Sequence, residues 1–461
     1  MDRPADKPGR PRWHLLFGLL AISMLVKGLL WTFAIPPFDA PDEPAHYSHA
    51  QLLALRGRLP TAGNLDSTSP DVALMVSAIL LSVTPGTPEA RLYQERGGSG
   101  PVGPAEIAAA KTAQQPVSQT PSGSYSPVGY VLYAVPIRLF APQGIVAQLA
   151  GARLVAVLLG TAAVLAVAWA GLEAGLDARM ATAAGVIAGY QPMWSQQTAV
   201  VTADAALFCF ASLFFALMLR TLRRPSRRLG VATAAVLALT LLSKPAGLFA
   251  LPFAVIFFIP AIRARGRERV DALAVGFGLS LLAALPFVAW NRYRPAGVPP
   301  TAGRGTLVQY AHILRDAGFA YPRGLIGQFW GDFGWLEQSL SPGVITGLRY
   351  VSLIAVMFCG AALLKRGRGR SGIVLGMAYF VACAAVAFGF DLLLWLNQGG
   401  LGVQGRYLLP ALGGAAVAVV AALNRLLPRP AATVVGSLVA GGMVVLNFVS
   451  LATLSARFFV S

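Results

Sequence analysis

The stretch Pro36-Pro37-Phe38-Asp39-Ala40-Pro41-Asp42-Glu43-Pro44-Ala45-His46-Tyr47, here called the acidic motif, directly follows the first long apolar run, residues 13–35. Proline fixes φ and disfavours helix in the residue before it, so these prolines stop the preceding helix. Asp42, Glu43 and His46 are thereby predicted to lie just outside a bilayer. Glu43 and His46 share a face if a helix restarts at Pro44.

The composition predicts an all-α polytopic membrane protein. The chain has 461 residues, of which 56% are hydrophobic and 12% charged, and its mean hydropathy is +0.63. A soluble protein of this length carries about twice that charged fraction. The formal net charge of +18 could suggest nucleic acid. Its basic residues form short clusters between apolar runs, as positive-inside topology requires, so we expect no nucleic-acid partner.

The apolar runs predict about 11 transmembrane helices in the inner (plasma) membrane of a bacterium. Basic residues within 1–12 place the N-terminus in the cytoplasm, and the odd number of spans places residues 454–461 outside. Four Arg/Lys clusters then face the cytoplasm, within residues 1–12, 220–228, 263–269 and 365–370. The predicted spans are residues 13–35, 146–172, 180–196, 204–220, 229–243, 246–262, 270–290, 343–364, 372–395, 407–427 and 431–453.

These spans form two blocks, 146–290 with helices 2–7 and 343–453 with helices 8–11, which leave two long extracytoplasmic loops, 36–145 and 291–342. The first loop contains two apolar segments, 72–83 and 128–140, both short for a spanning helix. One further span would move every later basic cluster outward. The two segments are therefore either surface or re-entrant helices, which we favour, or a pair of extra spans that raises the number to 13.

The carboxylates of the acidic motif suit chemistry at a membrane surface. A carboxylate can deprotonate an acceptor hydroxyl when its geometry is held, and a second one can accept a hydrogen bond or bind a metal. A helix-capping role explains one acidic residue, but it does not explain an Asp-Glu-x-x-His set. The pattern therefore favours a functional site at Asp42, Glu43 and His46.

Two further charged residues are predicted at the outer surface, with a structural and a functional interpretation equally open for each. Asp204 begins a span, where it either complements the helix N-terminus or serves as a costly and therefore functional membrane-edge acid. Lys244 lies in the turn Ser243-Lys244-Pro245. It either anchors the turn by reaching to water or binds a lipid phosphate as a point charge.

Polar and aromatic residues gather on the same side nearer the C-terminus. Arg406 lies in Gln404-Gly405-Arg406-Tyr407. This segment is predicted at the outer surface, where the positive-inside rule does not favour a positive charge. Phosphate binding by its guanidinium is the preferred interpretation, and an interfacial arginine beside a belt tyrosine is the alternative. The segment 329–336 with Trp335 is typical of an aromatic belt, and a sugar-stacking platform is the functional alternative.

The order of these motifs resembles a known superfamily. A first span followed at once by an Asp-Glu motif in a long outer loop is similar to the GT-C superfamily of membrane glycosyltransferases. The segments 41–46, 243–245, 333–335 and 404–410 resemble more closely an uncharacterised bacterial family of polytopic membrane proteins related to it. These motifs cover nearly the whole chain.

The resemblance implies transfer of a sugar from a polyprenyl-phosphate donor, embedded in membrane lipid, to an envelope glycan, lipid or protein acceptor at the extracytoplasmic face. It implies Asp42 as general base, with Glu43 and Asp204 in the catalytic set. It also implies Lys244 and Arg406 at the donor phosphate, with His46, Gln404, Tyr407 and Trp335 as further substrate-binding residues.

Several points stay open at the level of sequence. Some GT-C members need a divalent metal ion, for which Asp42, Glu43, His46 and Asp204 are the candidate ligands here. The sugar, the acceptor and the oligomeric state are not indicated. A transporter or flippase of a lipid-linked saccharide is the main alternative function, and a non-catalytic partner in an envelope-polymer complex is a third. The scarcity of charge within most spans counts against transport.

Overall fold

The computed structural model describes residues 13–38, 40–62, 119–257, 266–294, 305–316, 320–333, 338–365, 370–399 and 403–459. Its regular structure is helical apart from two pairs of two-residue strands. β1 (Thr61–Ala62) pairs in parallel with β2 (Gln119–Thr120), and β3 (Asp332–Phe333) pairs antiparallel with β4 (Gln338–Ser339). The expected all-α class is confirmed.

Eight helical segments within the described ranges are long and apolar enough to cross a membrane. Six of them are whole or nearly whole helices: α1 (Trp13–Ala34), α7 (Ile145–Glu173), α10 (Ala203–Arg223), α16 (Pro342–Leu364), α17 (Arg370–Gln398) and α19 (Arg429–Phe459). The others are the later part of α13 (Arg267–Tyr293), and the 3₁₀ segment η4 (Gly405–Ala411) continuing into α18 (Leu412–Leu426). The multi-pass membrane architecture follows from their length and hydropathy.

The other three predicted spans are shorter or interrupted, so the number 11 stays a prediction. The predicted span 180–196 is divided into α8 (Ala178–Gly189) and α9 (Pro192–Gln197), with the break just before Pro192. The spans predicted at 229–243 and 246–262 correspond to α11 (Arg227–Ser243) and the 3₁₀ segment η3 (Pro245–Phe257).

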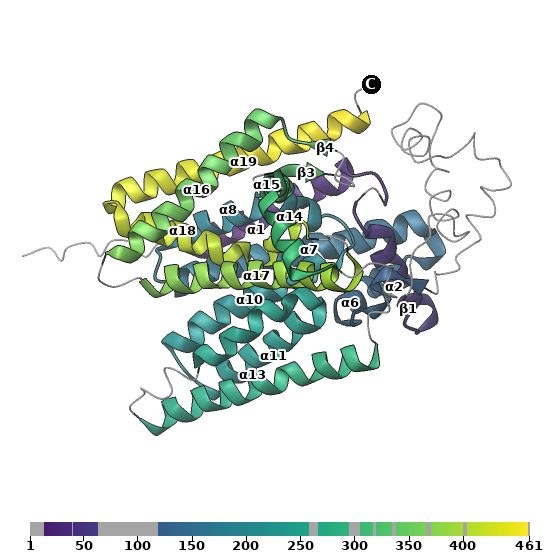
Figure 1. Ribbon diagram of the computed structural model, residues 1–461, viewed down its shortest axis with the longest axis horizontal. Coiled ribbons are helices and arrows are strands. Elements are labelled where there is room, and N and C mark those ends of the chain that lie inside the picture. Colours follow the sequence, from purple (N-terminus) through teal and green to yellow (C-terminus); the bar gives the residue numbers. More distant parts are fainter. Residues whose placement is uncertain are drawn as a thin grey trace, which may run out of the picture.

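The long helices run alongside one another, with α13 and α19 along opposite edges in the view of Figure 1. At the centre, α7 packs against α1, α8, α10 and α18. Small residues on α7 allow these close approaches. A Cβ added at Gly160 would lie 2.5 Å from Thr198, and one added at Gly171 would lie 3.0 Å from the Ala181 backbone.

Short elements of the first loop gather at one end of this bundle, at the right of Figure 1. They are α2 (Glu43–Arg56), η1 (Pro121–Ser124), α6 (Val128–Leu139) and η2 (Ala141–Gln143). Tyr47 on α2 packs in one buried cluster with Tyr130 and Tyr133 on α6. With 12 residues, α6 is about 18 Å long and too short to cross a bilayer alone. The segment predicted at 72–83 lies outside the described residues.

The second predicted loop also contains helices, α14 (Leu307–Asp316) and α15 (Ala320–Gly331), followed by β3 and β4. α15 packs against α9 and η4, and so reaches the same end of the bundle as the first loop. At the C-terminus, α19 continues to Phe459, beyond the predicted boundary at residue 453.

Candidate functional site

The acidic motif connects α1 to α2 through a backbone of unusual conformation. α2 begins at Glu43, one residue before the expected restart at Pro44, and Asp42 is its N-cap residue. Among the residues that the structure describes, Phe38 (φ 61°) and Asp42 (φ 64°) are the two non-glycine residues with positive φ. A left-handed conformation costs about 1–2 kcal/mol in such residues. Strain of this kind persists only where surrounding contacts impose it, and it gathers at functional sites.

Asp42 points its carboxylate toward Arg406, 364 positions further along the chain. The Arg406 Nη2 group donates to Asp42 Oδ2 at 2.5 Å, while 49% of the Asp42 side chain stays exposed. Desolvation raises the pKa of Asp42, but the nearby positive charges, Arg406 above all, lower it more, so the pKa lies below its ordinary value. Asp42 is therefore an ionised carboxylate that is both anchored and open to a substrate.

A second ion pair, between Asp204 and Lys244, lies beside the first. Lys244 Nζ donates to Asp204 Oδ1 and Oδ2 at 2.9 and 3.0 Å, and both side chains are nearly buried. Burial lowers the pKa of Lys244, but the Asp204 charge raises it more, so the pKa lies above its ordinary value. Lys244 therefore keeps its positive charge in this turn between α11 and η3.

The ring of Tyr407 joins the two ion pairs. Lys244 Nζ lies 5.2 Å from its centroid and Arg406 Cζ lies 5.6 Å from it, so one aromatic ring borders two cations. Cation–π attraction stabilises each cation there. The structure thus brings together four charged groups that the sequence predicted singly, from the first loop, the start of α10, the Lys244 turn and the start of η4.

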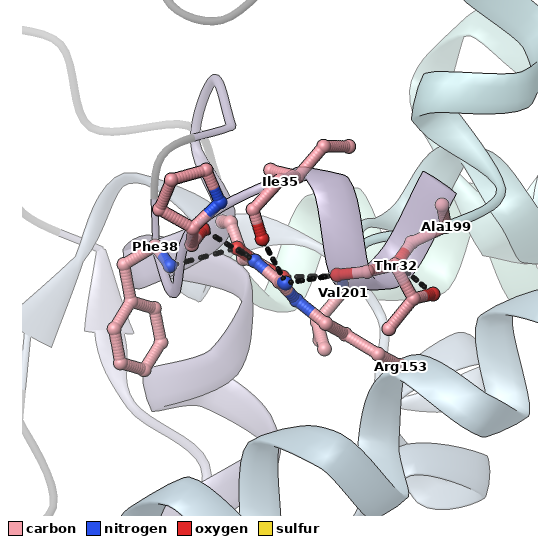
Figure 2. A network of polar contacts seen from close by, with 8 residues as sticks. Thr32, Ile35, Phe38, Arg153, Ala199 and Val201 are labelled. Atoms are coloured by element: carbon pink, nitrogen blue, oxygen red, sulfur yellow. Dashed lines mark hydrogen bonds and ion pairs between the residues drawn. The ribbon is translucent and has the colours of Figure 1, made fainter. Parts of the chain in front are cut away.

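Glu43 has a different environment from its neighbour Asp42. Its side chain is fully buried, and Arg153 of α7 donates to Oε1 at 2.8 Å and to Oε2 at 2.6 Å. The backbone N–H groups of Phe38 and Val201 donate to the same two oxygens. Figure 2 shows this network. Both carboxylate oxygens are occupied, so this arrangement does not present Glu43 to a substrate.

His46 is buried one turn after Asp42. Its Nδ1 atom and the Tyr130 hydroxyl lie 2.6 Å apart. Burial lowers the pKa of His46 to about 4, with Asp42 opposing the shift, so the ring is neutral at pH 7. His49, for which the sequence predicts no role, stacks on the ring of Tyr130, and the two ring centroids lie 3.8 Å apart.

The Gln404-Gly405-Arg406-Tyr407 segment fits tightly against α15. Gln328 Oε1 accepts from the Gly405 N–H at 3.0 Å. A Cβ on Gly405 would lie 2.3 Å from both Leu325 O and Phe329 N, so only glycine permits this approach. Gln404 Oε1 is buried and has no hydrogen-bond partner within the described ranges. Trp335 lies outside the described residues, and its predicted stacking role stays a prediction.

The candidate metal ligands turn to different partners. Asp42 faces Arg406, Glu43 faces Arg153 and His46 faces Tyr130. In the described ranges no group of three or more His, Cys, Asp or Glu side chains is placed to hold a metal ion. Because Asp42, Glu43 and His46 point to three different partners, their placement does not fit a divalent ion held by all three.

Two important charged residues were missed because they lie inside predicted spans. Arg153 is one. The other is Lys27 in α1, which donates to Gly189 O at 2.7 Å and to Ser195 Oγ at 3.1 Å. The signal was present in the sequence, because a cation within an apolar run is costly and must find polar partners inside the bundle.

The fold and this constellation define a polytopic membrane protein with a cluster of charged side chains at one end of its helical bundle. One solved structure supports the fold. The chain aligns with ArnT from Cupriavidus metallidurans in the apo state, with a TM-score of 0.51 and 16% identity over 97% of this chain and 77% of that one. The Archaeoglobus fulgidus oligosaccharyltransferase in complex with Zn and sulfate also aligns, with a TM-score of 0.41 and 16% identity over 72% of this chain. The chain spans 44% of the length of that transferase.

The family model "Predicted membrane protein (DUF2142)" matches residues 25–413, and the chain belongs to this family. The match confirms the expected uncharacterised membrane family and covers every candidate site residue. A search of curated proteins found no match.

Proposed function

We propose that the protein is a glycosyltransferase that moves a sugar from a polyprenyl-phosphate donor to an acceptor at the extracytoplasmic face of a bacterial inner membrane. The observation that carries the proposal is one grouping of charges. A half-exposed carboxylate, Asp42, lies beside Arg406, and Arg406 shares the ring of Tyr407 with Lys244. The GT-C fold supports the same class of reaction.

The cations suit the phosphate of the donor. Arg406 is 5% exposed and Lys244 is 11% exposed, so neither charge is strongly screened by water. An arginine fork binds two phosphate oxygens, and an ammonium adds a point charge. Gln404 and Tyr407 flank the same position and complete the headgroup site.

The chemical step is a single displacement at the anomeric carbon. Asp42 takes the proton of the acceptor hydroxyl as the hydroxyl oxygen bonds to that carbon. The bond from the anomeric carbon to the phosphate oxygen breaks, and its electron pair leaves on the polyprenyl phosphate. Arg406 and Lys244 stabilise the charge that develops there. Displacement from the opposite face inverts the anomeric configuration.

Asp204 has an electrostatic role in this proposal. Its carboxylate is 6% exposed and accepts both hydrogen bonds from Lys244, so it fixes the position of the ammonium. His46 is neutral and hydrogen-bonded to Tyr130, and in this proposal it lies beside the acceptor hydroxyl that Asp42 deprotonates. The acceptor is an envelope glycan, lipid or protein.

The main alternative was transport of a lipid-linked saccharide. That function would need charged groups along a path across the bilayer. Asp391, an acidic residue within α17, instead accepts hydrogen bonds from the Tyr310 hydroxyl and the Val403 N–H, each at 2.9 Å. These contacts fix the segment that leads to η4, which is a structural use of the charge.

The test uses proteoliposomes that contain labelled polyprenyl-phosphate sugars. Wild type should release the sugar by transfer or slow hydrolysis, and Arg406→Gln should lower donor turnover at least 100-fold. Asp271→Asn is the matched control, since its exposed pair with Arg227 lies away from the site. Movement of intact donor between leaflets by wild type, without release of sugar from any donor tested, would contradict the proposal and favour a flippase.

A further inference from the structure

We propose that the buried Glu43–Arg153 pair is a positioning device that sets the relative placement of the two site carboxylates, Asp42 and Asp204. This inference rests on the function proposed above. In the proposed function, neither Glu43 nor Arg153 contacts the substrate. Both act through the backbone segments that they hold together, which Figure 2 shows around the end of α1.

Arg153 has every donor occupied. Its Nε donates to Glu43 Oε1 and its Nη2 to Glu43 Oε2. The remaining N–H groups donate to three carbonyls at the end of α1, those of Thr32 (3.1 Å), Ile35 (2.7 Å) and Pro36 (2.9 Å). These five bonds use all five donors of a guanidinium. A lysine could not replace this fork.

The pair fixes the strained part of the acidic motif. Glu43 follows Asp42 in the chain, and its Oε2 accepts from the N–H of Phe38 at 3.1 Å. Phe38 and Asp42 are the two residues held in the left-handed conformation. Glu43 therefore ties together both strained positions, and the bonds that it makes impose the backbone that aims Asp42 at Arg406.

The same pair reaches the segment that carries the second carboxylate. Glu43 Oε1 accepts from the N–H of Val201 at 3.0 Å, three residues before Asp204. Thr32, which receives a bond from Arg153, donates its own hydroxyl to Ala199 O at 3.0 Å. One guanidinium and one carboxylate thus hold the Asp42 segment and the Asp204 segment against the same end of α1.

The energetics favour positioning over stability as the reason for this arrangement. Both side chains are at most 5% exposed, and removing two charges from water offsets most of their attraction. A well-packed apolar pair would hold the bundle equally well, but it would not orient three carbonyls and two N–H groups. Misplacing a reacting group by about 1 Å can slow a reaction roughly 100-fold.

The first test compares Glu43→Gln with Glu173→Gln. Glu173 is the matched control, since it is also nearly buried and paired with an arginine, Arg220, at 2.7 Å. It lies at the other end of α7, 20 residues or about 30 Å from Arg153. Glu43→Gln should lower kcat roughly 100-fold with the donor KM within about threefold of wild type, and Glu173→Gln should change neither.

A second variant separates positioning from folding. In Arg153→Ala, added guanidinium ion should raise kcat at least tenfold. The same ion should not raise the kcat of wild type or of Glu173→Gln. An equal loss of kcat in Glu43→Gln and Glu173→Gln, or no rescue of a folded Arg153→Ala, would overturn the inference.

A reporter independent of activity distinguishes failure of this inference from failure of the proposed function. In Asp42→Cys, the rate of labelling by a membrane-impermeant maleimide reports the placement of residue 42, and the native cysteines are all buried. Adding Glu43→Gln, or Glu43→Asp if the first does not fold, should change this rate at least fivefold. Adding Glu173→Gln should leave it unchanged. An unchanged rate with Glu43→Gln would reject positioning, even if transfer is confirmed.

Discussion

Loss of the Asp204 charge should destabilise the protein severely. With 2.9 Å between Lys244 Nζ and Asp204 Oδ1 and an effective dielectric constant of about 20, the attraction is about 6 kcal/mol. Part of it is offset by desolvation. Removing one partner of a nearly buried pair leaves the other unpaired, at a cost of about 3–5 kcal/mol. We therefore expect Asp204→Asn to lower the free energy of unfolding by that amount.

The assay is reversible unfolding in mixed micelles, with a double-mutant cycle. Lys244→Met in the Asp204→Asn background should recover much of the loss, with a coupling energy of about 2–3 kcal/mol. Asp271→Asn breaks an exposed pair with Arg227, 3.7 Å long, and should cost about 0–1 kcal/mol. The reasoning is refuted if Asp204→Asn costs no more than Asp271→Asn.

Three further predictions concern the same end of the bundle. Gly405→Ala should cost more than about 2 kcal/mol of stability, because its Cβ meets the α15 backbone, whereas Gly441→Ala, with nothing within 4 Å, should be neutral or slightly stabilising in thermal unfolding. Asp42→Gly should lower the melting temperature and abolish transfer, because leaving nearly buried Arg406 unpaired costs more than the roughly 1 kcal/mol of backbone strain that glycine relieves. Because the pKa of His46 is lowered to about 4, wild type should lose stability as pH falls from about 6.5 to 4, and His46→Gln should lose less over that window in pH-dependent unfolding.

The fold was predictable from local features. Apolar length located the eight segments that are long enough to cross a membrane, because a bilayer imposes that length on any spanning segment. The break between α8 and α9 was missed, although Pro192 marks it. Mean hydropathy does not register a turn that is buried inside the bundle, where neighbouring helices satisfy its backbone.

The candidate site was predictable in its members but not in its pairings. The number of predicted spans before each residue predicts that four charged residues lie at the same, extracytoplasmic face: Asp42, Asp204, Lys244 and Arg406. Which carboxylate meets which cation depends on helix packing, and Asp42 and Arg406 are separated by 364 positions. The partner of Glu43 was not predicted for the same reason: a cation within an apolar run, such as Arg153, indicates a polar partner inside the bundle but does not indicate which residue it is.

The most direct test of the account is the rate of sugar transfer by Asp42→Asn at saturating donor. Asparagine keeps the shape of the side chain but cannot accept the hydroxyl proton. The account predicts a fall in kcat of at least 1,000-fold, on the order expected for loss of a general base, with donor binding within about threefold of wild type. Transfer by Asp42→Asn at the wild-type rate would contradict the central claim that Asp42 is the base.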